Sequence, residues 1–191
     1  MLDKAQCQAW ADRVRSAPEA FTLFKFGLGG RPGAGYGGAG RADGPFNPTL
    51  DGAQFRRVAK SYANLREALG DDIDIAMHCL GQFDTPSAIG LCKAIEPIDP
   101  VFIEDPLTVR YSEAWLQLKR STRVPLFAGE KVELVSGFRP YLDNGVLDLI
   151  HPDVAYSGGI TGCRKIADYA ALTLYEDWLR AHIASGDTWW G

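Results

Sequence analysis

Three short segments decide the fold of this chain: IDIAMH at residues 73–78, VFIE at 101–104 and PLFAGE at 125–130. Each is an apolar run typical of a buried strand, and they end in His78, Glu104 and Glu130 respectively. These three polar residues lie 26 positions apart, close to the about 30 residues of a strand–helix–strand unit. Parallel strands of such units end at one edge of the sheet, where α/β proteins gather their ligands. The sequence therefore predicts one site built on three consecutive strands.

The order of the remaining elements predicts an α/β protein with a parallel sheet. Two further strands are expected at residues 21–26 and 147–150. Helices are expected to begin near Asp3, Asp51, Ser112 and Ser157, and at Thr85 as an N-cap followed by a proline. A further short helix is expected to carry Phe138, Tyr141 and Leu142 on one side and to end at Gly145. This regular alternation favours a (β/α)-barrel over an open sheet. Because a complete eight-stranded barrel typically needs about 250 residues, the chain is predicted to be an incomplete (β/α)8 TIM barrel with about five parallel strands.

The composition indicates a soluble, cytoplasmic protein. A net charge of −4 gives no electrostatic reason to expect nucleic acid or an anionic membrane surface as a partner. The four cysteines lie far apart without a C-x-x-C pair, which disfavours a zinc site and a disulfide framework. No segment has the roughly 18–20 consecutive apolar residues of a membrane span, and the N-terminus lacks the pattern of a secretory signal.

Residues 27–50 are rich in glycine and are expected to form a loop. Residues 35–40 match G-x-G-x-x-G, but the next helix signal comes only at Asp51, so a dinucleotide site is disfavoured. A P-loop is excluded because no G-K-[ST] follows. A loop longer than about 15 residues is usually a functional lid or disordered. We expect a lid, with Tyr36 and Arg41 as candidate substrate contacts.

The chain divides into a barrel-like part, residues 1–171, and an atypical tail, residues 172–191. The strand–helix pattern stops after Ala171, and the chain ends in GDTWWG. Either the chain is a piece of a barrel, or the tail and a partner chain cover an open sheet edge. An uncovered edge favours aggregation, so a homo-oligomer or a complementing chain is an expected partner.

Four motifs resemble the enolase superfamily, with the closest similarity to the acid-sugar dehydratases of its mandelate racemase branch, such as galactonate and mannonate dehydratases. The motifs occur in the family's order, and they are FIEDP at 102–106, AGE at 128–130, HPD at 151–153 and SGGIT at 157–161. The resemblance implies a modified barrel that binds Mg²⁺ through carboxylates at the ends of three consecutive strands. It also implies that the metal holds a sugar-acid carboxylate while a base removes the neighbouring proton and water is eliminated.

The resemblance assigns roles to individual residues. Glu104 and Glu130 fall on the second and third metal ligands, and His78 falls on the first, which is normally aspartate. Lys25 falls on the first lysine of a catalytic K-x-K pair, whose second position is glycine here. Asp153 falls on the aspartate that orients a catalytic histidine. The strand that should carry this histidine, the capping domain and the last strand–helix units have no counterpart in the chain.

Several assignments leave alternatives open. His78 could bind metal, favouring Mn²⁺ or another divalent ion over Mg²⁺, or act as an acid–base group. Lys25 could contact an anionic substrate or pair with Glu104 or Asp153. His151 is expected to be structural or exposed. Two functions follow: a metal-dependent sugar-acid dehydratase, impaired by truncation, or a non-catalytic barrel remnant that binds metal or acids weakly or needs a partner chain.

Overall fold

The computed structural model describes residues 3–27 and 49–173, in which helices and parallel strands alternate as the sequence predicts. The elements in chain order are α1 (Lys4–Ser16), β1 (Leu23–Gly27), α2 (Gly52–Leu69), β2 (Asp74–His78), α3 (Thr85–Ile95), the 3-10 helix η1 (Glu96–Ile98), β3 (Phe102–Glu104), α4 (Glu113–Ser121), β4 (Leu126–Ala128), α5 (Leu134–Asp143), β5 (Leu149–Ile150) and α6 (Gly159–Thr173). None of the helices within these two ranges is long and apolar enough to cross a membrane.

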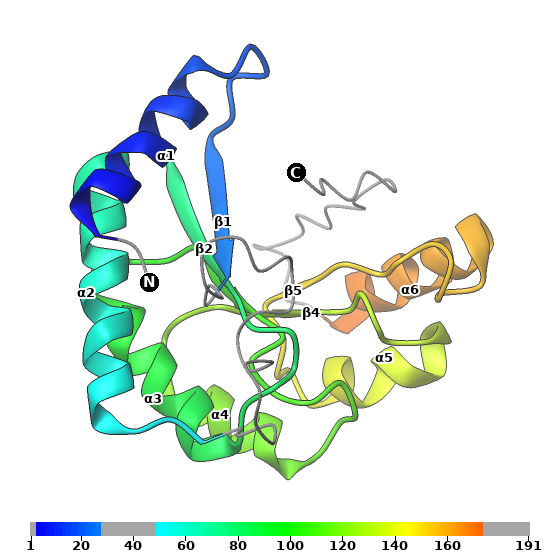
Figure 1. Cartoon of the computed structure of the whole chain (residues 1–191). Helices are drawn as coiled ribbons and strands as arrows, with labels where there is room; N and C mark the ends of the chain where they lie inside the picture. The colour runs from blue at the N-terminus through cyan, green and yellow to red at the C-terminus, as the bar shows by residue number, and fades with distance from the viewer. Residues whose placement is uncertain (1–2, 28–48, 174–191) are drawn as a thin grey trace, which may run out of the picture.

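The strands form one parallel sheet of five strands in the order β1-β2-β3-β4-β5. In Figure 1 the helices follow an arc around them, from α1 and α2 on the left, through α3 and α4 below, to α5 and α6 on the right. Consecutive strands are therefore neighbours, and each crossover helix lies on the same side of the sheet. This arrangement confirms the predicted α/β fold with five barrel-like strand–helix units.

The strands are shorter than the apolar runs that predicted them. The expected strand at 21–26 begins only at Leu23, because the pairing with β2 starts where Leu23 meets Asp74. The expected strand at 147–150 keeps only Leu149 and Ile150, whose partners on β4 are Phe127 and Ala128. The length of these strands is set by how many residues pair with the neighbouring strand. That pairing cannot be seen in one segment of sequence.

Three of the described helices, α1, α2 and α3, begin at an aspartate whose side chain caps the first turn. Asp3 and Asp51 both form capping boxes. In each, the aspartate side chain accepts a hydrogen bond from the backbone N–H of the glutamine three residues later, and the side chain of that glutamine accepts one from the backbone N–H of the aspartate. For α3 the N-cap is Asp84 rather than Thr85: its carboxylate accepts the N–H of Ser87. Pro86 then lies within the first turn, where its missing N–H costs nothing.

The core lies between the sheet and the helices. Large side chains fill it, and those with almost no exposure include Tyr62, Leu65, Trp115, Phe138 and Tyr141. The indole of Trp115 packs edge-on against the ring of Tyr141 and donates to the carbonyl of Thr108. The four cysteines are free and buried, and three of them, Cys7, Cys79 and Cys92, belong to this core.

Each end of the sheet carries exposed apolar surface. Within the described ranges, β1 and β5 each pair with a strand on one side only. Leu23 on β1 is 40% exposed, and Ile160 and Leu172 on α6 are 81% and 84% exposed. In a closed barrel further strand–helix units would cover both ends.

Candidate functional site

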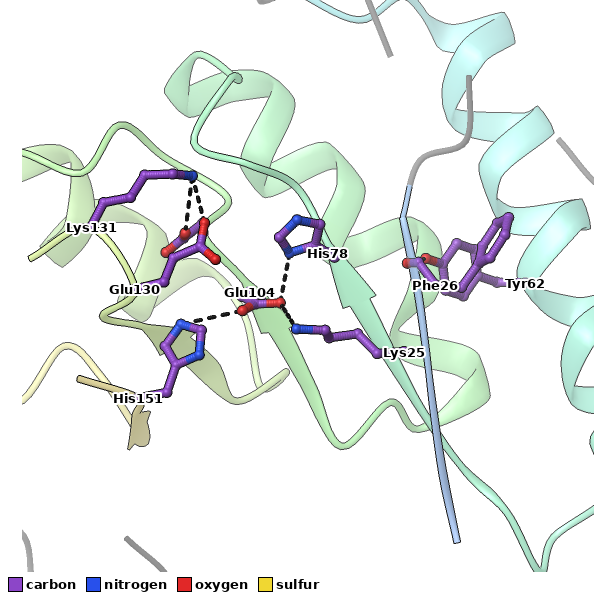
Figure 2. A network of polar contacts seen from close by, with 9 residues as sticks. Lys25, Phe26, Tyr62, His78, Glu104, Glu130, Lys131 and His151 are labelled. Carbon is purple, nitrogen blue, oxygen red and sulfur yellow. Dashed lines mark hydrogen bonds and ion pairs between the residues drawn. The ribbon is translucent and has the colours of Figure 1, made fainter. Parts of the chain in front are cut away.

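The carboxyl ends of the parallel strands lie along one edge of the sheet, here called the rim. Several of the predicted polar residues lie at this rim. The register aligns Gly27 with His78 and His78 with Glu104, so the last residues of β1, β2 and β3 lie side by side. Lys25 lies two residues before the end of β1, on the same face as Gly27. Figure 2 shows Lys25, His78 and His151 all pointing toward Glu104.

Glu104 is the centre of this rim, and three nitrogen atoms surround its carboxylate. The Nζ atom of Lys25 and the Nδ1 atom of His78 each lie 2.6 Å from Oε2. The Nε2 atom of His151 lies 3.2 Å from Oε1, although the two atoms are not aligned for a hydrogen bond. The Glu104 side chain is 0% exposed and that of His78 is 6% exposed, whereas the Lys25 side chain is 37% exposed.

These neighbours keep Glu104 ionised. Burial raises its pKa, but the hydrogen bond from His78 and the positive charge of Lys25 outweigh burial and lower the pKa to about 2. Since Glu104 is a carboxylate near neutral pH, the hydrogen bond to His78 requires a proton on Nδ1, which donates it. Burial lowers the pKa of His151 despite the nearby charge of Glu104, which favours a neutral imidazole there.

A second cluster, formed by Asp105, Glu130 and Lys131, lies beside Glu104. Lys131 Nζ is 2.6 Å from Glu130 Oε1 (Figure 2). It is 3.8 Å from Asp105 Oδ2. Asp105 is buried, and its Oδ2 atom makes no hydrogen bond. Burial, with the negative charges of Glu104 and Glu130, raises the pKa of Asp105 to about 7. Three carboxyl groups thus crowd one end of the sheet.

Two close contacts to the backbone hold the segments that carry the rim residues in place. The hydroxyl of Tyr62 on α2 donates a 2.6 Å hydrogen bond to the carbonyl of Phe26, directly after Lys25 (Figure 2). Gly129 has a φ of 149°, and a Cβ atom there would lie 2.9 Å from both N and O of His151. The absence of a side chain at Gly129 therefore allows the segments that carry Glu130 and His151 to meet.

The predicted metal ligands are only partly brought together. His78 and Glu104 are in direct contact, while Glu130 pairs with Lys131. Over residues 3–27 and 49–173, no group of three or more His, Cys, Asp or Glu side chains is arranged to hold a metal ion. The three-ligand site accordingly stays a prediction. Of the alternatives for Lys25, the structure shows the ion pair with Glu104.

The other predicted site residues lie elsewhere. Asp153 follows β5 in the loop before α6, and its Oδ1 atom accepts the N–H groups of Ala155 and Tyr156. Its carboxylate therefore orders its own loop. Tyr36 and Arg41, with most of the glycine-rich stretch, lie outside the described residues, as does the tail beyond Thr173.

His151 and Asp105 are rim residues that sequence reasoning missed. His151 was expected to be structural or exposed, yet it follows β5 directly and is 13% exposed against Glu104. The regular spacing did not assign His151 to the site because it lies 21 residues after Glu130, not 26. A search for the first polar residue after every strand would have found it. Asp105 escaped because adjacent strand residues ordinarily face opposite ways, whereas Asp105 has a φ of 45° and leaves the strand geometry.

The types of donor at the rim suit a divalent cation, although within the described residues they are not arranged as a metal site. The buried Oε1 of Glu104 and Oδ2 of Asp105 lack hydrogen bonds, and an unsatisfied buried oxygen is costly. Carboxylate oxygens are the ligands that Mg²⁺ and similar hard ions prefer. Glu104 and Glu130 could hold such an ion with Asp105 beside it, and His78 would add a nitrogen that suits Mn²⁺ better.

Comparison with known proteins places this chain among similar folds. A family model described as enolase C-terminal domain-like matches residues 5–176. A member of the enolase superfamily from Salmonella Typhimurium is 28% identical, with a TM-score of 0.77 over 91% of this chain and 43% of that one. A candidate dehydratase from Zymomonas mobilis ZM4 is also 28% identical, with a TM-score of 0.76 over 89% of this chain and 42% of that one.

A third similar structure is a mandelate racemase/muconate lactonizing enzyme-like protein from Rubrobacter xylanophilus DSM 9941. It is 26% identical, with a TM-score of 0.74 over 90% of this chain and 42% of that one. This chain therefore spans less than half the length of these three proteins.

Proposed function

Because this chain belongs to the enolase superfamily, through its C-terminal barrel domain, we propose that its rim is the metal and acid-binding part of a sugar-acid dehydratase. Glu104 and Glu130 would hold a divalent cation, Mg²⁺ or Mn²⁺, with His78 next to Glu104. The observation that carries this proposal is the buried, ionised Glu104 at the end of β3, with Glu130 and Asp105 beside it. The similarity to a candidate dehydratase supports the reaction class.

The residues of the rim suit an anionic substrate. When bound, the cation supplies Lewis-acid stabilisation of the negative charge that develops on the substrate carboxylate. The ammonium group of Lys25 is partly exposed at the rim and can contact a carboxylate. His78 Nδ1 donates to Glu104 Oε2 and so fixes the orientation of that carboxylate. Asp153 would contribute only by ordering the loop before α6, and Tyr36 and Arg41 remain candidate substrate contacts.

Calorimetric titration with Mn²⁺ and Mg²⁺ tests the metal site. We expect saturable binding to the wild-type chain and at least about tenfold weaker binding to Glu104→Gln and Glu130→Gln, since second-shell changes alone cost 10–100-fold. Glu113→Gln, at the exposed start of α4, is the matched control and should bind as the wild type does. Absence of binding to the wild type, or equal binding to all variants, would remove the metal site.

A second candidate function is a barrel part that needs another chain to complete it. The observation that favours it is the five-stranded sheet with one-sided edges at β1 and β5, in a chain that spans 43% of a similar protein. Incubation of the chain with a library of sugar acids, followed by detection of 2-keto acid product, separates the two candidates. Turnover by the chain alone would support the complete enzyme, whereas metal binding without turnover supports the incomplete barrel.

A further inference from the structure

We propose that the groove between α5 and α6 binds a phosphate group at the end where both helices begin. The groove has a volume of about 740 Å³, which falls within the about 300–1,000 Å³ of small-molecule sites. At this end its lining residues are Leu134, Val135, Ser136, Gly158, Thr161 and Gly162. Lys25, His78, Glu104 and Glu130 do not line it, so the inference does not depend on the proposed metal site.

The topology of the chain brings the starts of the two helices together. Helix α5 follows β4 and α6 follows β5, and the two helices pack against each other (Figure 1). In strand–helix units of a parallel sheet, each helix returns antiparallel to its strand, so α5 and α6 begin at the same end. Two positive ends of helix dipoles therefore face one end of the groove.

Neither helix start is capped by a side chain. The N-cap residue of α5, Glu133, makes no side-chain cap hydrogen bond, and the residue before α6 is Gly158, which has no side chain. Among the described residues, the backbone N–H groups of Ser136 and Thr161, in the first turns, have no acceptor. Such uncapped N–H groups at the start of a helix are the donors that bind phosphate in many proteins.

A buried hydroxyl group independently points to a ligand at this end. Ser157 lies directly before the two glycines at the start of α6, lines the groove and is 0% exposed. Its Oγ atom makes no hydrogen bond with any residue that the structure describes. Because a buried hydroxyl without a partner is costly, an oxyanion seated at the groove end would satisfy it as acceptor.

The charge of the groove favours an anion. Lys165 on α6 lines the groove, is exposed and pairs with no carboxylate within residues 3–27 and 49–173. Helical side chains lean toward the N-terminus of their helix, so its ammonium group extends toward the first turn. The acidic lining residue, Asp168, lies 4.0 Å from Nε of Arg164. A phosphate group, with several acceptor oxygens, suits donors spread over two helices and a lysine.

Titration with inorganic phosphate at constant ionic strength, followed by two-dimensional NMR of the backbone amides, tests the site. We expect saturable shifts of the Ser136 and Thr161 signals. Ser157→Ala and Lys165→Met should each bind phosphate about fivefold more weakly, the effect of one hydrogen bond or one exposed charge pair. Lys60→Met, which removes an exposed lysine of α2, is the control and should bind as the wild type does.

The stability of Ser157→Ala separates a role in binding from a role in folding. Since Ser157 Oγ makes no hydrogen bond with the described residues, its removal should leave the free energy of unfolding in urea unchanged or raise it. Phosphate affinity should fall in the same variant. A less stable variant with unchanged affinity would make the hydroxyl structural and overturn the proposal.

A second titration, with hexyl phosphate, identifies the source of the phosphate group. Tighter binding than that of inorganic phosphate would indicate an organic phosphate whose apolar part lies along the groove, and equal binding would indicate free phosphate. Equal phosphate affinity in the wild type and all three variants would overturn the site. Signal shifts confined to the rim residues would also overturn it, and neither result would affect the proposed metal site.

Discussion

Glu104 and Asp105 are adjacent buried carboxyl groups with opposite chemistry. Both have little exposure, so the difference comes from their neighbours. Glu104 faces Lys25 and His78, and its pKa falls to about 2. Asp105 has a lysine only at 3.8 Å, and burial, with the negative charges of Glu104 and Glu130, raises its pKa to about 7. The partner therefore decides the charge of each group, as it does when two carboxylates share a site.

The Asp105→Asn variant should become more stable than the wild type as the pH rises, because the wild type loses stability and the variant does not. The native pKa of about 7 exceeds the usual value of 3.8, so the native state binds the proton more tightly and the wild type loses stability between about pH 4 and pH 7. Asparagine stays neutral. The advantage of the variant should grow with pH by about 4 kcal/mol in all.

Urea denaturation at pH 4.5, 6 and 8 in chelator-containing buffer measures this difference. Asp72→Asn, at an exposed position before β2, is the control and should follow the wild type. If the Asp105→Asn and wild-type stabilities change in parallel with pH, the raised pKa of Asp105 is wrong.

Part of the rim was predictable at this scale, and part was not. The regular spacing of His78, Glu104 and Glu130 predicted that these residues end neighbouring strands, because strand–helix units of similar length place their ends side by side; the structure adds the contact between His78 and Glu104. The pairing of Glu130 with Lys131 was not predictable, because it depends on the side-chain conformations of a loop. His151 joins the rim through a shorter unit, which the spacing argument cannot detect.

At the scale of elements, the ends of β4 and β5 depend on one close approach. Gly129 lies directly against the backbone of His151. Because Glu130 follows Gly129 in the chain, this approach brings the segments of Glu130 and His151 together. Helix starts at Asp3 and Asp51 were predictable because capping is local. The strand limits were not, because they depend on register with a neighbour far along the chain.

Gly129→Ala should destabilise the chain by about 4 kcal/mol, the middle of the summed range of two costs. The backbone conformation costs an alanine about 1–3 kcal/mol, and the overlap with His151 adds about 1–3 kcal/mol of overpacking. Gly145→Ala is the matched control, since Gly145 also has a positive φ, of 58°, but a Cβ there would meet nothing within 4 Å. It should cost only about 1–2 kcal/mol. Urea denaturation compares the two, and equal losses would show that the contact with His151 carries no cost.

For the molecule as a whole, the open ends of the sheet matter most. The exposed side chains of Ile160 and Leu172 lie on α6, next to the last strand, and Leu23 lies on the first. A groove between α5 and α6, lined in part by Leu134, Tyr169 and Leu172, adds apolar surface at the same end. Edge strands, which pair with a neighbour on one side only, and exposed apolar patches both favour association with another chain.

We expect the chain to self-associate as its concentration rises. The double variant Ile160→Glu/Leu172→Glu should shift the equilibrium toward monomer, because burying two carboxylates in a contact is unfavourable. Gln117→Glu, which adds one charge at an exposed position of α4, should not. Light scattering after size-exclusion chromatography over a range of concentrations gives the masses. A wild-type chain that stays monomeric throughout would exclude this role for the α6 end.

The pairing of Ile103 and Glu104 with Leu126 and Phe127 has a consequence for how this region can change during evolution. Ile103 is 0% exposed in the hydrophobic core, and the next residue points the other way, into the rim. Loss of a single codon within β3 would turn the glutamate toward the helices and bring Asp105 to its place among Lys25, His78 and His151. Insertions and deletions should therefore accumulate in the loops between elements, while the three residues of this strand keep their number.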